Sequence, residues 1–243
     1  MDTIEAICEW ISDHAGKAGR SGAVVGLSGG IDSAVVGALL KRALGDNVVG
    51  IIMPCHSQPS DEHCARISAS AFDIKVERVD LGPVYDNFVQ SLPPGNLLSV
   101  ANLKPRLRMI TLYYHANNLG YLVAGTGNKS ELTAGYFTKF GDGGVDILPI
   151  GGLLKTQVRE VARKLGVPQA IIDRPPSAGL WEGQTDEAEM GISYRDLDFT
   201  IEAIEKGDTS QCAPNLLTKV RDMRRISEHK RCTAPIFAPP IGS

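Results

Sequence analysis

The sequence predicts an α/β fold with a doubly wound, mostly parallel sheet and helices on both faces. Four short apolar runs are typical of buried strands, at 23–27, 48–53, 74–79 and 121–125. Helical patterns precede and separate them, at 3–15, 32–44, 60–72, 83–91 and 103–118. This alternation is typical of a parallel sheet, and 243 residues suffice for one large core. We therefore expect residues 1–243 to form a single domain.

The pattern changes after residue 150, and we expect a helical C-terminal part. Its three helices are predicted at 155–165, 194–205 and 214–228. Residues 175–185 are rich in proline, glycine and serine, which favours a mobile loop beside a functional site over an inert linker. The prolines of residues 233–243 favour a tail that lies on the surface.

The turn between the first predicted strand and the next helix has the features of an anion-binding loop. It consists of Gly26, Leu27, Ser28, Gly29, Gly30, Ile31, Asp32 and Ser33. Backbone N–H groups at a helix N-terminus point outward, and the helix dipole adds about half a positive charge there. Ser28 and Ser33 add hydroxyl donors, and Asp32 places a carboxylate where Mg²⁺ can bridge it to phosphate oxygens.

Three known motifs compete for this turn. The Walker loop requires Lys-Ser or Lys-Thr after its second glycine, and the Rossmann fingerprint requires G-x-G-x-x-G; neither is present. Gly26–Gly30 does fit G-x-S-x-G, which would make Ser28 the nucleophile of an α/β hydrolase. That elbow normally follows several strands, however, and it gives no role to Asp32. Ser28–Ser33 instead resembles the SGGxDS loop of the N-type ATP pyrophosphatases, which cleave ATP between the α and β phosphates.

A second polar turn, Gly125–Glu131, follows the strand predicted at 121–125. In a parallel sheet it lies at the same edge as the first turn, where ligands bind. Thr126 can donate to a phosphate or a ribose, and Glu131 can share a Mg²⁺ ion with Asp32. Two carboxylates together with phosphate oxygens and water suit Mg²⁺.

The segment Tyr136–Asp146 combines three aromatic residues, one lysine, three glycines and two aspartates. Aromatic side chains can stack on a flat ring, Lys139 can pair with a carboxylate or a phosphate, and an aspartate can accept hydrogen bonds from ribose hydroxyls. A hydrophobic loop with a solvated charge is the alternative.

Together these segments resemble the ammonia-dependent NAD synthetase family. The resemblance runs from Gly26 to Arg231 and depends on five blocks, at 26–33, 104–109, 125–131, 137–155 and 229–231. The first block also occurs in GMP synthetase, asparagine synthetase and tRNA-modifying relatives. The stretch Lys139–Gly144 with Asp146 is more specific. The resemblance implies an adenine nucleotide alpha hydrolase-like fold.

The resemblance also implies roles for individual residues. ATP would bind the loop Gly26–Ser33 together with Thr126, Lys155 and Ser177, and Mg²⁺ would bind Asp32 and Glu131. The deamido-NAD substrate would bind Arg106, Lys139, Asp146, His229 and Lys230. The catalytic groups would be Asp32, Lys155, which neutralises charge at the α-phosphorus, and Ser28, which donates hydrogen bonds.

The implied activity is amidation of deamido-NAD to NAD through an acyl-adenylate, with release of AMP and pyrophosphate. Free ammonia is the expected nitrogen donor, because 243 residues leave no room for a glutaminase segment. The family is homodimeric, with deamido-NAD at the subunit interface. The alternatives are another N-type ATP pyrophosphatase with a different carboxylate or carbonyl substrate, and the α/β hydrolase using Ser28.

Composition argues against several other classes of protein. A net charge of −3 disfavours a nucleic-acid binder, and no apolar run reaches the roughly 18 residues of a membrane span. Five dispersed cysteines are typical of free thiols in a cytoplasmic protein. Four of the potential zinc ligands form two adjacent pairs, Cys55-His56 and His63-Cys64. Zinc sites usually space paired ligands by two or more residues, so we expect no metal site there.

Overall fold

The computed structural model describes residues 2–181 and 183–238. Within them, one sheet contains the strands β1 (Ala23–Gly26), β2 (Val48–Ile52), β3 (Lys75–Arg78) and β4 (Leu122–Ala124). Their order is β3-β2-β1-β4, and every neighbouring pair is parallel. The chain passes from β1 outward to β3 and then returns to place β4 on the other side of β1. The four predicted strands and the doubly wound sheet are therefore confirmed, and the strand order reverses between β1 and β4.

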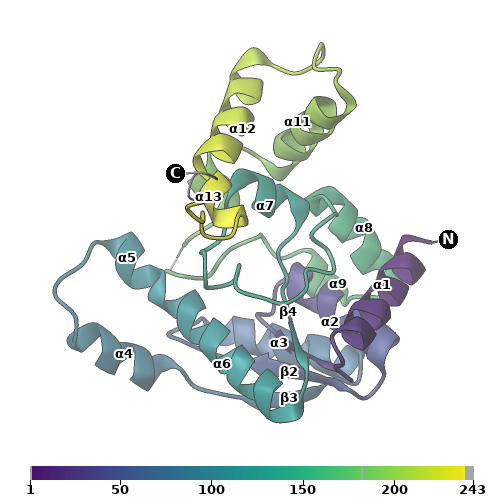
Figure 1. Ribbon diagram of the computed structural model, residues 1–243, viewed down its shortest axis with the longest axis vertical. Coiled ribbons are helices and arrows are strands. Elements are labelled where there is room, and N and C mark those ends of the chain that lie inside the picture. Colours follow the sequence, from purple (N-terminus) through teal and green to yellow (C-terminus); the bar gives the residue numbers. More distant parts are fainter. Residues whose placement is uncertain (1, 182, 239–243) are drawn as a thin grey trace.

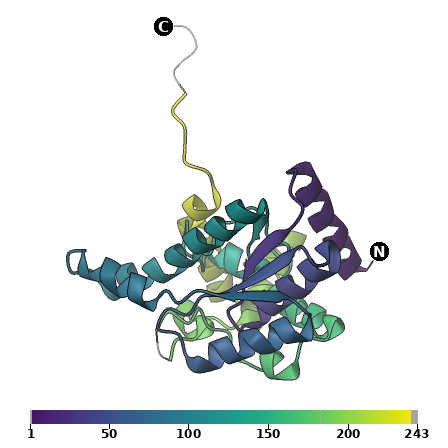
Figure 2. The same ribbon diagram turned by 90° about the horizontal axis from the view of Figure 1, so that it is seen from below.

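Helices cover both faces of the sheet, as predicted (Figures 1 and 2). One face carries α1 (Thr3–Lys17), α2 (Ile31–Leu44), α3 (Pro59–Ala71), α8 (Lys155–Leu165) and α9 (Gln169–Ile172). The other carries α4 (Gly82–Gln90), α5 (Leu97–Ala101) and α6 (Leu103–Leu119). Side chains of β1 alternate between the two layers, because Val25 joins the core under α2 whereas Val24 joins the core under α6.

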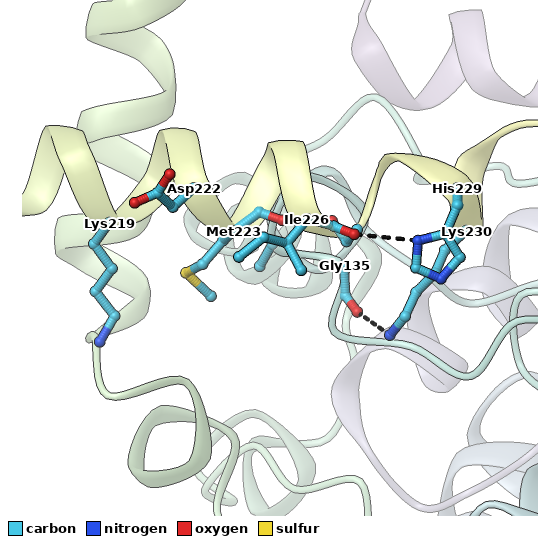
Figure 3. A pocket seen from close by; sticks show the side chains of 9 residues that line it. Gly135, Lys219, Asp222, Met223, Ile226, His229 and Lys230 are labelled. Carbon is cyan, nitrogen blue, oxygen red and sulfur yellow. Dashed lines mark hydrogen bonds between the residues drawn. The ribbon is translucent and has the colours of Figure 1, made fainter.

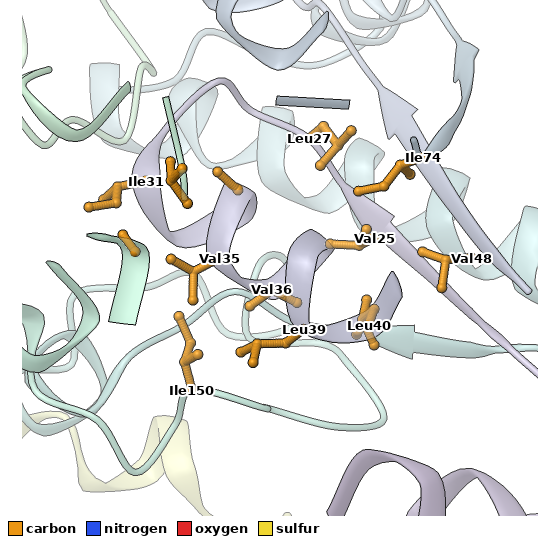
Figure 4. Packing of buried hydrophobic residues seen from close by; sticks show 14 of the residues in the cluster. Val25, Leu27, Ile31, Val35, Val36, Leu39, Leu40, Val48, Ile74 and Ile150 are labelled. Carbon is orange, nitrogen blue, oxygen red and sulfur yellow. The ribbon is translucent and has the colours of Figure 1, made fainter. Parts of the chain in front are cut away.

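The largest core lies between the sheet and the first group of helices (Figure 4). Helix α2 is at its centre, with Val35, Leu39 and Leu40 fully buried. A helix that is apolar on most sides is stable only when it is enclosed, and α2 contacts the sheet, α1 and α8. The turn before α2 is therefore attached to the best buried helix of the protein.

The helical C-terminal part forms a projecting hairpin (Figure 1). It contains α10 (Asp186–Met190), α11 (Tyr194–Lys206), α12 (Pro214–Ile226) and α13 (Glu228–Arg231). Helix α7 (Lys129–Ala134), which follows β4, packs against α11 and α12. Helices α11 and α12 lie side by side around a small core of their own that includes Leu197, Ile201 and Val220. The predicted helices at 155–165, 194–205 and 214–228 are confirmed, although the last divides at Ser227 into α12 and α13.

Two features differ from the expectation. Helix α5 was not predicted; Asn96 begins it by accepting a hydrogen bond from the Ser99 N–H at 2.8 Å. Residues 233–238 extend away from the protein instead of lying on its surface, with Ile236 91% and Phe237 84% exposed (Figure 2). Residues 239–243 of the same predicted tail lie outside the described residues.

Among the residues described, no helix has both the length and the apolar character needed to cross a membrane.

Candidate active site

A cavity of about 740 Å³ opens at the carboxyl ends of β1 and β4, where the strand order reverses. This is the position at which doubly wound sheets bind ligands. Its walls are formed by the turns after β1 and β4, by α6, by the segment that follows α9, and by His229 and Lys230. The two polar turns predicted from the sequence are thus brought together in one cavity.

The first turn is closed by its two serines. The Ser28 N–H donates to the Ser33 hydroxyl oxygen at 3.2 Å, and the Ser33 hydroxyl donates to the Gly30 carbonyl at 2.9 Å. The Gly30 N–H donates to the Ser28 hydroxyl oxygen at 3.3 Å. Helix α2 begins immediately afterwards at Ile31, so its free N-terminal N–H groups lie at the cavity. The side chain of Ile31 is buried in the core below (Figure 4).

Gly29 is required by its backbone geometry. Its φ is +82°, and a Cβ at this position would lie 2.3 Å from the Asp61 carbonyl oxygen. Arg174 fixes the same point, because its guanidinium donates to the Gly29 carbonyl at 3.0 Å and to the Asp61 carboxylate at 2.6 Å. The sequence did not indicate Arg174, which joins the turn to the segment 175–185.

The geometry gives no support to a serine nucleophile. The Ser28 hydroxyl interacts with Ser33 and with the Gly30 N–H, and in residues 2–181 and 183–238 no histidine is among its hydrogen-bond partners. A serine nucleophile needs an adjacent base.

Lys155 is the centre of the site. It is the first residue of α8, its side chain is 2% exposed, and its ammonium lies 2.5 Å from Asp32 Oδ2 and 3.2 Å from Glu131 Oε1. Burial alone would lower the pKa of Lys155, but the two carboxylates outweigh burial and raise the pKa above its ordinary value. Lys155 is therefore a fixed cation in the cavity wall.

Glu131 is positioned by a capping box at the start of α7. The Asn128 side chain accepts from the Glu131 N–H at 3.0 Å, and Glu131 Oε2 accepts from the Asn128 N–H at 3.3 Å. Asn128 Nδ2 also donates to Asp32 Oδ1 at 3.0 Å, which ties the second turn to the first. Burial raises the pKa of Glu131 to about 7, although Lys155 opposes the shift. Asn128 was not predicted as a site residue, but its N-x-x-E spacing was a readable signal.

The carboxylates of Asp32 and Glu131 fit a Mg²⁺ ion that arrives with a nucleotide. They surround a common point, now taken by the Lys155 ammonium, and both line the cavity. Among the described residues, no group of three or more His, Cys, Asp or Glu side chains is placed to hold a metal by itself. Mg²⁺ characteristically uses one or two carboxylates and takes its remaining ligands from phosphates and water.

These features agree with the comparisons with known proteins. A family model described as NAD synthase matches residues 3–234. The chain belongs to this family. It is 51% identical over 232 residues to the NH(3)-dependent NAD(+) synthetase of Carboxydothermus hydrogenoformans, and the matched region covers 93% of each chain.

Two solved structures are similar over nearly the whole chain. The NMN synthetase from Francisella tularensis is 37% identical with a TM-score of 0.88, and the match covers 96% of each chain. The NH3-dependent NAD synthetase from Campylobacter jejuni, in complex with the nitrate ion, is 29% identical with a TM-score of 0.85, over 98% of this chain and 100% of that one. The expected adenine nucleotide alpha hydrolase-like fold is thereby confirmed.

The sequence predicts five residues that bind the second substrate of this NAD synthase family member. Four of them line the same cavity, namely Arg106, Lys139, His229 and Lys230. Lys139 donates to the His229 carbonyl, and Lys230 donates to the Gly135 and Phe137 carbonyls at 2.8 and 3.0 Å. Three separate elements therefore meet at this end of the cavity.

Asp146, the fifth, does not line the cavity. Its carboxylate accepts from the Val123 N–H at 2.8 Å and from the Tyr113 hydroxyl at 2.9 Å. Within one described chain, Asp146 therefore holds β4 against α6 and is not assembled with the other four.

A smaller pocket of about 430 Å³ lies between α12 and the end of α7 (Figure 3). It shares Gly135, His229 and Lys230 with the main cavity, and Met223 and Ile226 form its apolar side. No residue of the Gly26–Ser33 turn lines it. The two polar turns expected to bind phosphate therefore line the larger cavity and not this pocket.

The segment 175–185 lies against the main cavity, and Ser177 and Thr126 are both part of the lining. The Ser177 hydroxyl donates to the Gln184 carbonyl at 2.7 Å, and Lys104 from α6 donates to the Leu180 carbonyl at 2.8 Å. Burial lowers the pKa of Lys104, which is 7% exposed. The segment is thus tied to α6 by a buried lysine; its residue 182 lies outside the described residues.

Proposed function

We propose that this member of the NAD synthase family amidates deamido-NAD to NAD with ammonia, using ATP and releasing AMP and pyrophosphate. The observation that carries the proposal is the Lys155–Asp32–Glu131 cluster beside the Ser28–Ser33 turn, at the reversal point of the sheet. The curated relative at 51% identity is named for the same activity.

The reaction needs ATP because a carboxylate oxygen is a poor leaving group. The nicotinate carboxylate attacks the α-phosphorus of ATP, pyrophosphate departs, and an acyl-adenylate forms. Ammonia then attacks the activated carbonyl carbon, and AMP departs as the amide forms. The enzyme supplies orientation and charge stabilisation, which are the main contributions in such chemistry.

Each part of the site has a task in this scheme. The N–H groups and hydroxyls of Ser28–Ser33 bind the pyrophosphate, and the Lys155 ammonium neutralises charge at the α-phosphorus. Asp32 and Glu131 would hold Mg²⁺, which would supply positive charge to the phosphates. Thr126 and Ser177 contribute hydroxyls to ATP, and closure of 175–185 excludes water from the adenylate.

Arg106, Lys139 and Lys230, together with His229, would hold the anionic deamido-NAD, because they place three cations at one end of the cavity. We assign Asp146 to the same substrate from the family resemblance; its exposure leaves it accessible from a second subunit.

Helices α4, α5 and α6 support the proposed homodimer. They expose large apolar side chains, among them Val84, Phe88, Leu97, Leu98, Ile110 and Tyr114. Five free cysteines support a cytoplasmic location. The family match over 3–234 supports one catalytic domain.

A pyrophosphate-release assay tests the function. ATP, Mg²⁺, ammonium and deamido-NAD are supplied together and then omitted one at a time, and NAD is measured in parallel. We expect pyrophosphate and NAD only with the full set, and none when glutamine replaces ammonium. Because one structural neighbour is an NMN synthetase, nicotinate mononucleotide is tested as the competing substrate. Faster turnover of the mononucleotide would refute the assignment of deamido-NAD.

A further inference from the structure

The first two N–H groups of α8, which carries Lys155, are bonded to side chains of other elements, whereas the Leu154 N–H before the helix donates to Gln157 of α8 itself at 2.9 Å. Leu154, the residue before the helix, has no polar side chain with which to cap it. Instead the Lys155 N–H donates to the Ser130 hydroxyl oxygen of α7 at 2.9 Å. The Thr156 N–H donates to Asp198 Oδ2 of α11 at 2.8 Å. The backbone at Lys155 is therefore placed by tertiary contacts.

Asp198 connects both of these contacts. Its side chain is 3% exposed, and its second oxygen, Oδ1, accepts a hydrogen bond from the same Ser130 hydroxyl that caps Lys155. Both carboxylate oxygens are thus paired, and the negative charge lies at the positive end of the α8 dipole. Asp198 itself does not line the cavity.

We propose that Asp198 is a positioning residue that places the Lys155 ammonium for adenylation of the substrate. The inference rests on the proposed function. Ser130 directly precedes Glu131, so the Asp198–Ser130 bond also fixes the backbone next to the second carboxylate of the cluster. One buried carboxylate on the C-terminal hairpin thereby sets the relative position of Lys155 and Glu131, two groups that meet the phosphates of ATP.

The test compares three variants in the full-length protein. Asp198→Ala removes both contacts. Asp198→Asn preserves the shape and one acceptor for the Thr156 N–H, but its amide group cannot accept from Ser130. Glu205→Gln is the matched control: Glu205 joins α11 to α7 through Lys129 at 2.6 Å and makes no contact with the start of α8.

Adenylation is measured as ATP–pyrophosphate exchange with deamido-NAD and no ammonia, normalised to the active fraction by the pyrophosphate burst. We expect Asp198→Ala to lower exchange about 100-fold, as displacement of a reacting group by roughly 1 Å does. The KM for ammonia should change less than about twofold, because ammonolysis follows adenylation. Asp198→Asn should recover part of the loss, and Glu205→Gln should match the unmodified protein.

Two results would overturn the proposal. If the normalised exchange rate of both Asp198 variants equals that of Glu205→Gln, the carboxylate does not position Lys155. A uniform fall in exchange and ammonolysis would show a merely structural role. Failure of the unmodified protein to exchange pyrophosphate would instead remove the proposed function, and it is recognised separately because it precedes any substitution.

Discussion

Replacing Lys155 by methionine should destabilise the protein strongly in the absence of Mg²⁺. Its ammonium is 2.5 Å from Asp32 and 3.2 Å from Glu131, and the side chains of these three residues are 2%, 18% and 16% exposed. Methionine fills a similar volume but leaves two neighbouring carboxylates without a cation. Breaking a buried ion pair costs about 3–5 kcal/mol. Because both carboxylates retain a bond to Asn128 and some exposure, we expect the free energy of unfolding to fall by about 3 kcal/mol, at the lower end of this range.

Urea unfolding at pH 8, with and without Mg²⁺, measures this effect. Mg²⁺ should restore part of the lost stability of Lys155→Met, because a divalent cation between the carboxylates replaces the missing charge. Lys129→Met is the control. It removes a more exposed pair with Glu205, whose side chains are 28% and 47% exposed, and should cost at most about 1 kcal/mol. Equal stabilities of the two variants without Mg²⁺ would refute the reasoning.

Three further predictions concern the same cavity. Asp32→Ala should lower Mg²⁺-dependent pyrophosphate release about 100-fold, whereas Asp46→Ala, with a side chain 81% exposed, should leave it unchanged; an active Asp32→Ala protein would contradict the assignment. Gly29→Ala should lose roughly 2 kcal/mol of stability and raise the KM for ATP, unlike Gly152→Ala, where a Cβ meets nothing within 4 Å; thermal unfolding and kinetics measure both. The pKa of Glu131 is raised from 4.5 to about 7, and a metal ligand must lose its proton. Mg²⁺ affinity should therefore fall up to about tenfold per unit below pH 7 and level off above it, and equal half-saturating Mg²⁺ concentrations at pH 6 and 8 would exclude this.

Local patterns determined most of the fold. Helix α8 begins at Lys155 and ends at Leu165 as predicted, because its apolar stripe and the left-handed Gly166 are both visible in sequence. The strands were visible for the same reason, as short apolar runs between turns. Helix α5 was missed because a five-residue helix has no measurable periodicity.

The site was predictable only in part. The two turns were visible because their residue types directly reflect phosphate chemistry, and the sheet then brings them together. Arg174 contacts Gly29, which lies 145 positions away in the chain, and Asp198 contacts Thr156, which lies 42 positions away. No local sequence pattern reveals contacts over such separations. Asp146 shows the reverse limitation. Its residue type suits a ribose, but in this chain its carboxylate is bonded to the backbone of β4.

The side-chain cluster around Lys155 contains more hydrogen-bond acceptors than donors to satisfy them. Tyr194 Oη lies 3.2 Å from Glu131 Oε1 and 2.9 Å from Asp186 Oδ2, yet a hydroxyl has one proton and can satisfy only one of them. Asp186 Oδ1 is buried and has no hydrogen-bond partner among the described residues. Each such group costs about 1–3 kcal/mol. Lys155 forms ion pairs with Asp32 and Glu131, and Asp186 acts on it through its charge, so one cation serves three carboxyl groups. Burial raises the pKa of both Glu131 and Asp186, which favours uptake of a proton by this cluster. This region of the fold therefore gives up stability to keep several carboxyl groups together beside the Ser28–Ser33 turn, an arrangement that is typical of functional sites.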